Sequence, residues 1–158
     1  MANYRKEIAH MLDRMLIKVL HQDKAGFYKK ALSVKLNLLD LLILRRLDEI
    51  GMMKLSDMVS YLEVDRNVLT TSLKRLQSVN LICKRTDTVD GRGQIIALSE
   101  YGEQFVKALS EASQSEMDFV LRDITVNEEK AILKFLSKIV QYHTDKYELD
   151  VFDTKQKY

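Results

Sequence analysis

Polar and basic side chains are predicted to gather on one face of a short helix that begins near residue 66. Leu69, Leu73 and Leu76 recur at helical spacing and define its apolar face. At about 100° per residue, the opposite face carries no carboxylate. Its members are Asn67, Val68, Thr71, Lys74, Arg75 and Ser78. An amide can hydrogen-bond a base edge and a cation can neutralise a phosphate, so this face is typical of a DNA-binding surface.

A second basic group follows where the hydrophobic period changes to that of strands. Two β-rich runs, residues 81–86 and 94–98, flank a turn at residues 90–93. The basic residues of this hairpin are Lys84, Arg85 and Arg92. Because side chains alternate along a strand, only one of Lys84 and Arg85 can face DNA. A solvated helix face and a plain hairpin with an exposed arginine are the simpler alternatives.

Capped helices upstream are expected to position the basic helix. Asn37 can cap a nearly all-apolar helix, with Asp40 in its first turn and Gly51 at its end. A short helix capped by Ser56 comes next. Asp65 then caps the basic helix after a tight connection. Two short helices joined in this way, with a basic hairpin behind them, indicate a winged helix-turn-helix.

The stretch from residue 64 to residue 102 resembles the multiple-antibiotic-resistance-regulator (MarR) family of bacterial winged-helix transcription factors. The wing signature of that family, D-x-R, a strand and L-[ST]-x-x-G, is matched by Asp90, Arg92, Leu98, Ser99 and Gly102. Its recognition-helix pattern is matched by Asp65, Arg66, Leu69, Thr70, Leu76 and Leu81. The sequence departs from the family at Thr71, where a basic residue is common, and at Asn80, where glycine is usual.

Roles for individual side chains follow from their positions on this layout. Asn67 could hydrogen-bond a base edge and Val68 could contact a thymine methyl in the major groove. We expect Arg92 at the minor groove, and the resemblance implies that Asp90 braces that arginine or its turn. The predicted DNA-binding residues are Arg66, Asn67, Val68, Thr70, Thr71, Lys74, Arg75, Lys84, Arg85, Asp90 and Arg92.

Helices at both chain ends carry apolar stripes that the small core of residues 36–102 cannot cover. We therefore expect residues 1–35 to form a dimerisation helix and connector, the latter with a partial turn around Phe27 and Leu32, and residues 103–147 to form two further dimerisation helices. The predicted dimerisation residues are Ile8, Met11, Leu12, Met15, Ile132, Phe135 and Ile139. Thr125 and Glu128 form a capping box for the last helix. Residues 148–158 read as a polar tail.

Charge distribution is more informative than net charge in this chain of 158 residues. A net charge of +2 is too small to indicate a polyanionic partner. Residues 65–98, however, carry net +3, whereas residues 99–130 carry net −5, so only the first region suits a polyanion. A single cysteine, no visible signal peptide and no apolar run of ~20 residues favour a cytoplasmic protein without membrane contact.

The sequence thus predicts a mainly α fold with a small β-hairpin wing, and a function as a sequence-specific regulator of double-stranded DNA. We expect a homodimeric repressor on a pseudo-palindromic operator with half-sites ~10 base pairs apart. The resemblance implies that a small lipophilic effector releases the repressor from DNA. For Cys83 there are two interpretations: it receives a redox signal, or it is simply a small buried side chain of an apolar strand. No catalytic motif, metal-ligand spacing or cofactor site is evident. A winged-helix module that binds another protein is the alternative.

Overall fold

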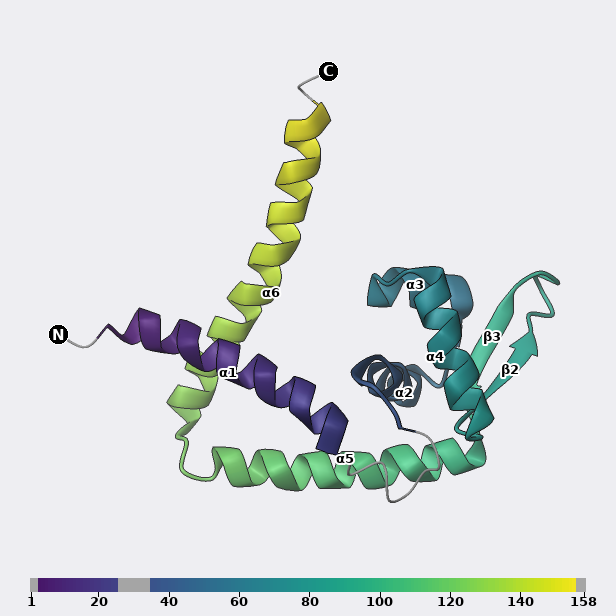
Figure 1. The fold of residues 1–158 in the computed structure, drawn as a ribbon, viewed down its shortest axis with the longest axis horizontal. Helices are drawn as coiled ribbons and strands as arrows, with labels where there is room; N and C mark the ends of the chain where they lie inside the picture. Colours follow the sequence, from purple (N-terminus) through teal and green to yellow (C-terminus); the bar gives the residue numbers. More distant parts are fainter. Residues whose placement is uncertain (1–2, 26–34, 156–158) are drawn as a thin grey trace. The chain divides into compact units, whose positions relative to one another are not determined.

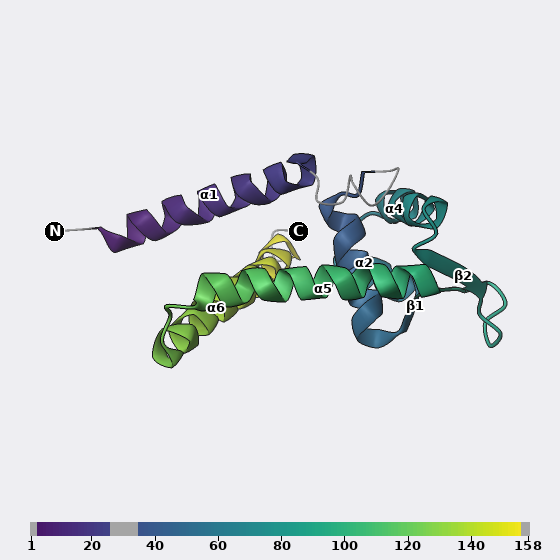
Figure 2. The same ribbon diagram turned by 90° about the horizontal axis from the view of Figure 1, so that it is seen from below.

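The computed structural model describes residues 3–25 and 35–155, and the chain falls into two compact units, residues 1–110 and 111–158. The elements, labelled in Figure 1 and Figure 2, are α1 (Tyr4–Ala25), α2 (Leu38–Ile50), β1 (Met52–Lys54), α3 (Leu55–Leu62), α4 (Arg66–Ser78), β2 (Ile82–Thr86), β3 (Gln94–Leu98), α5 (Glu100–Leu121) and α6 (Val126–Lys155). The predicted class, mainly α with a small β wing, is confirmed. The expected turn around Phe27 and Leu32 lies outside the described residues.

Local signals position the helices of the helix-turn-helix. Asn37 and Asp40 form a reciprocal capping box at the start of α2, each side chain accepting from the other residue's amide at 2.9 Å. Gly51 ends α2 with a φ of +81°, which glycine tolerates. The prediction that Ser56 caps α3 is wrong: Lys54 is the N-cap, without a side-chain bond. The helix begins early because Lys54 is held extended as the last residue of β1.

The recognition helix α4 ends in a way that turns the chain directly into β2. Asp65 caps its start by accepting from the Asn67 amide at 2.7 Å. Asn80 lies in the left-handed region at φ +60°, and the Leu81 amide donates back to the Leu76 carbonyl at 3.0 Å. The expected left-handed role of Asn80 is therefore confirmed. The buried apolar face of α4 is thus followed closely in the chain by two buried residues, Leu81 and Ile82, at the start of the wing.

A three-stranded antiparallel sheet of order β1-β3-β2 carries the wing. The hairpin of β2 and β3 was predicted; β1 was not, because three residues are too few to show alternation. β1 pairs Lys54 with Ile95 and thereby joins the wing to the helices before it. The loop between β2 and β3 projects away from these helices (Figure 2).

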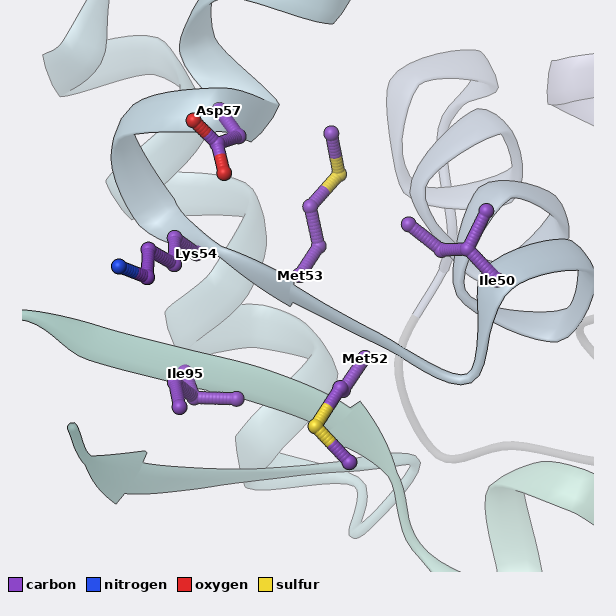
Figure 3. A pocket seen from close by; sticks show the side chains of 6 residues that line it. All are labelled: Ile50, Met52, Met53, Lys54, Asp57 and Ile95. Atoms are coloured by element: carbon purple, nitrogen blue, oxygen red, sulfur yellow. The ribbon is translucent and has the colours of Figure 1, made fainter. Parts of the chain in front are cut away.

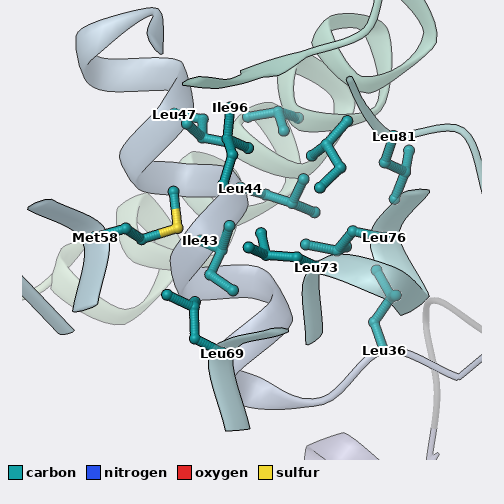
Figure 4. Close-up of a cluster of buried hydrophobic side chains, with 12 residues drawn as sticks. Leu36, Ile43, Leu44, Leu47, Met58, Leu69, Leu73, Leu76, Leu81 and Ile96 are labelled. Atoms are coloured by element: carbon teal, nitrogen blue, oxygen red, sulfur yellow. The ribbon is translucent and has the colours of Figure 1, made fainter. Parts of the chain in front are cut away.

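One core unites these elements (Figure 4). Its fully or nearly fully buried members are Leu36, Ile43, Leu44, Leu47, Met58, Leu69, Leu73, Leu76, Leu81, Ile82, Ile96 and Val106. Gly102 lets α5 approach β2 closely, because a Cβ there would lie 1.9 Å from the Leu81 carbonyl oxygen. Ser99 caps α5 by accepting from the Gly102 amide and also donates to the Asn80 carbonyl. Ser99 and Gly102 together thus fix the base of the wing.

The helices near the two ends leave much apolar surface exposed in the single chain. In α1, Ile8, Met11 and Met15 are about half exposed. In α6, Ile132 and Phe135 are exposed and Ile139 is half-buried. The capping box that opens α6 is confirmed, and α6 continues to Lys155, past residue 147, where the helical region was expected to end. Within the described ranges, no helix is long and apolar enough to cross a membrane.

Candidate nucleic-acid interface

The outward face of α4 presents the side chains expected to read DNA. Asn67, Val68 and Lys74 are exposed, Val68 with 51% of its surface accessible. Thr71 is exposed too, and its hydroxyl donates to the Asn67 carbonyl at 2.9 Å. Thr70 is half-buried and donates to the Arg66 carbonyl at 2.8 Å. These bonds stay within the helix, so the face can meet a groove without breaking other contacts of the fold.

Arg75 departs from the role expected of it. Its Nη1 donates to both carboxylate oxygens of Asp40, at 2.8 and 3.0 Å. Asp40 has no exposed surface, and the Arg75 side chain is 28% exposed. The predicted phosphate contact must therefore compete with a buried carboxylate. No local pattern could reveal this link between α2 and α4, since its partners are 35 residues apart.

Lys84 and Arg85 lie on opposite faces of β2, as alternation requires. Lys84 is opposite Ile96 in the sheet, and directly paired residues project to the same face. Since Ile96 is buried, Lys84 lies on the core side and is half-buried. Arg85, opposite Ile95, is exposed. Of the two cations, Arg85 is the more accessible to a ligand.

Asp90 braces the wing turn through the backbone. Its Oδ1 accepts from the Arg92 amide at 3.2 Å, and its carbonyl accepts from the Gly93 amide at 2.9 Å. Arg92 itself is exposed, and no ion pair joins its guanidinium to Asp90. An acid at the tip of a basic wing is therefore explained by the turn that it closes.

Asp87 is a wing residue that the sequence analysis did not single out. Its side chain is 5% exposed; Oδ1 accepts from the Val89 amide at 2.9 Å and Oδ2 lies 3.1 Å from the Lys54 Nζ. The Val89 amide and the Lys54 ammonium together hold the pKa of Asp87 below its usual value. Asp87 in turn raises the pKa of Lys54. Both groups therefore carry charge at neutral pH.

An open, mainly apolar hollow of about 300 Å³ includes Lys54 of this ion pair in its lining. It is lined by Ile50, Met52, Met53, Lys54, Asp57 and Ile95. The ammonium of Lys54 extends away from Ile50 and Met52, so the cation does not face the apolar side chains (Figure 3). The hollow has the character of a surface depression at the edge of the sheet.

Cys83, the single cysteine of the sequence, is the remaining side chain that the sequence analysis singled out. Cys83 is half-buried on β2, with its Sγ 3.8 Å from the Leu98 carbonyl oxygen. No group of three or more His, Cys, Asp or Glu side chains in the part of the chain that the structure describes has the arrangement of a metal site.

Comparison with known proteins agrees with this geometry. Residues 36–93 match the sequence model of the MarR family. The uncharacterized HTH-type transcriptional regulator YxaD of Bacillus subtilis (strain 168) is 24% identical over 98 residues, which are 62% of this chain and 68% of that protein. The fold is similar to FabT of Streptococcus pneumoniae, solved in complex with DNA (TM-score 0.75, 14% identity, 90% of this chain and 99% of that one). It is also similar to the transcriptional regulator SlyA (TM-score 0.71, 18% identity, 94% and 99%).

The matched residues run from the last residues before α2 to the wing turn, the region that holds the helix-turn-helix and the basic wing. The resemblance seen in the sequence is confirmed there. Over these residues the chain is similar to the MarR family, and its fold is similar to that of the solved structures named above.

Proposed function

We propose that this protein is a sequence-specific double-stranded DNA-binding repressor that acts as a homodimer. One observation carries the proposal: an exposed helix face without a carboxylate, bearing Asn67 and Lys74, lies in the same compact unit as an exposed wing-tip cation, Arg92. Such a pair of elements suits the major groove and an adjoining groove or backbone. FabT, whose fold is similar, was solved with DNA.

In this proposal, the side chains divide into those that read bases and those that hold phosphates. Asn67 and Val68 meet base edges, while Thr71 and Lys74 reach bases or phosphates one turn further along α4. The phosphate contacts come from Arg66, Thr70 and Arg85. Lys84, which lies on the core side of β2, is left out of this set. Thr70 and Thr71 now donate within α4, so each hydroxyl must rotate before it can donate to DNA.

Arg75 has a different main role from the phosphate contact that the sequence predicted. Because Nη1 is engaged by Asp40, we propose that its main role is to hold α4 against α2, with the rest of the guanidinium left for DNA. Asp90 orders the wing turn and Arg92 enters or covers the minor groove.

Dimerisation would place two copies of this interface on one duplex. The exposed apolar residues of α1 and α6 support it, with Ile8, Met11, Leu12, Met15, Ile132, Phe135 and Ile139 as the proposed contacts. Two-fold symmetry then demands a pseudo-palindromic operator with half-sites ~10 base pairs apart. A small lipophilic effector or a redox signal would release the repressor by changing the separation of its two recognition helices.

Selection of bound duplexes from a random pool, followed by affinity measurements on selected and random DNA, tests the proposal. We expect Arg92→Ala to weaken binding to both DNAs and to lower the salt slope by about 1. Asn67→Ala should cost ~1–3 kcal/mol on selected DNA and little on random DNA. Lys107→Ala, an exposed change in the acidic region, should alter neither.

Three outcomes would contradict parts of this assignment. Equal losses on both DNAs for Asn67→Ala would remove its base-reading role. Tight binding that does not weaken with salt would argue against phosphate contacts. Absence of any salt-dependent binding to duplex DNA would favour the alternative, a winged-helix module that binds another protein.

A further inference from the structure

Asp87 is the point at which the wing loop is tied to the rest of the winged-helix unit. It follows the last residue of β2, and its amide donates to the Gly93 carbonyl at 2.8 Å, which closes the base of the loop. Its carboxylate accepts from the Val89 amide with one oxygen and pairs with Lys54 through the other. A Cβ at Gly93 would lie 3.2 Å from the Asp87 Cβ, so the two sides of the loop are in close contact here.

Lys54 belongs to the other side of this connection. It is the last residue of β1 and the N-cap of α3, the first helix of the helix-turn-helix. The ion pair therefore joins the wing loop to the element that precedes the recognition helix. Backbone pairing of Lys54 with Ile95 fixes where the strands lie, but it does not reach the loop.

The loop beyond Asp87 has little else to hold it. Residues 88–92 are all exposed, and the bond from the Arg92 amide to Asp90 is internal to the turn. The Lys54 side chain is 51% exposed, and a pair with an exposed cation contributes little to global stability. A role in stability alone thus explains the arrangement poorly, whereas a role in fixing the direction of the loop fits it.

We propose that Asp87 and Lys54 are positioning residues of the DNA interface, which hold the wing loop so that Arg92 meets the duplex at a fixed distance from α4. This inference rests on the proposed DNA-binding function. Neither residue needs to touch DNA. The ion pair acts through Arg92, and its value lies in reducing the number of loop orientations that binding would otherwise have to restrict.

A purely electrostatic effect of Asp87 and a positioning role of Asp87 predict opposite effects of Asp87→Asn on DNA affinity. Loss of a negative charge near a polyanion should by itself strengthen binding. Positioning predicts that Asp87→Asn weakens binding to the selected operator, by roughly 3- to 10-fold, because the loop loses its tie to Lys54. Glu63→Gln, which removes the exposed carboxylate of the residue that ends α3, is the matched control and should bind as well as the wild type or slightly better.

The decisive measurement is how much the effect of Arg92→Ala on DNA affinity changes when Asp87 is also replaced. We expect Arg92→Ala to cost at least about 3-fold less affinity in the Asp87→Asn background than in the wild type, since an unheld loop has already lost part of that contact. Lys54→Met should weaken binding and show the same coupling, and Lys54→Arg should restore most of the affinity. Urea unfolding of each full-length variant checks that the fold is intact; Lys54→Met provides the test if Asp87→Asn does not fold.

Tighter or unchanged binding by Asp87→Asn and Lys54→Met, together with an undiminished Arg92→Ala effect, would overturn the positioning role. That failure is distinct from failure of the proposed function. If the wild type binds DNA and Arg92→Ala weakens it, only the positioning role falls. If the wild type itself shows no salt-dependent binding to duplex DNA, the proposed function falls and takes this inference with it.

Discussion

Asp40 and Arg75 illustrate how a single ion pair can fix the recognition helix. Of the ion pairs seen among the described residues, only this one has a carboxylate with no exposed surface. The Asp40 carboxylate also accepts from the Asn37 amide, so one side chain serves the start of α2 and the end of α4. Sequence patterns predicted the cap but not the pair, because a capping box is local and a contact across 35 residues is not.

Replacing Asp40 by asparagine should destabilise the protein substantially. The substitution keeps an acceptor for the Asn37 amide but leaves Arg75 without its counter-charge. We expect a loss of about 3 kcal/mol, the lower end of the ~3–5 kcal/mol seen when one partner of a buried pair is removed, because Arg75 is partly exposed. Urea unfolding measures it. Glu49→Gln, which breaks the exposed pair with Arg46, should change stability by less than ~0.5 kcal/mol.

Gly102 offers a second test at the residue scale. Alanine would place a Cβ 1.9 Å from the Leu81 carbonyl oxygen, a backbone atom that cannot turn aside. We expect Gly102→Ala to cost at least ~2–3 kcal/mol in thermal or urea unfolding, at or above the usual range for overpacking. Gly91→Ala is the control, because a Cβ there meets nothing within 4 Å. Equal effects of the two changes would mean that α5 moves easily away from β2.

At the level of elements, the sequence predicted what local chemistry specifies. The end of α2 at Gly51, the start of α4 at Asp65 and the end of α4 before Asn80 were predicted from a side-chain cap and from residues that tolerate positive φ. The structure shows all three. The strand β1 was missed, and with it the early start of α3. Its three residues acquire strand geometry only by pairing with β3, more than forty residues later.

The wing and the start of α6 should make stability sensitive to acid. Amide donors lower the pKa of Asp87 and of Glu128, from usual values of 3.8 and 4.5. A folded pKa below the unfolded one contributes stability that is fully present above the unfolded pKa and lost as pH falls through the folded value. We therefore expect the urea midpoint to fall below about pH 4.5, and to fall less in Asp87→Asn and in Glu128→Gln. An unchanged pH profile in both variants would show that other carboxylates govern the acid transition.

At the scale of the whole molecule, the unpartnered apolar surface is the feature that the single chain does not explain. The apolar stripes of α1 and α6 were predicted from periodicity, and their exposure is what a chain built for assembly would show. How the stripes meet could not be predicted, because periodicity identifies a face but not its partner. The proposed dimer follows from this exposure, and it also determines whether two DNA-binding units can occupy one operator.

Phe135→Glu tests the dimer directly. Phe135 lies on the same side of α6 as Ile132 and Ile139, and a carboxylate buried there would lack a partner. We expect the dimer dissociation constant to rise by about 100-fold or more, the effect of losing a central interface anchor. Lys134→Glu, at about 200° from Ile132 around the helix, is the control and should leave the dimer intact.

Light scattering at micromolar concentration should then give twice 18.4 kDa for the wild type and the control, and 18.4 kDa for Phe135→Glu. The Phe135→Glu monomer should bind a half-site with nearly unchanged affinity but lose its preference for the palindrome. A mass of 18.4 kDa for the wild type in the same measurement would refute the dimer itself.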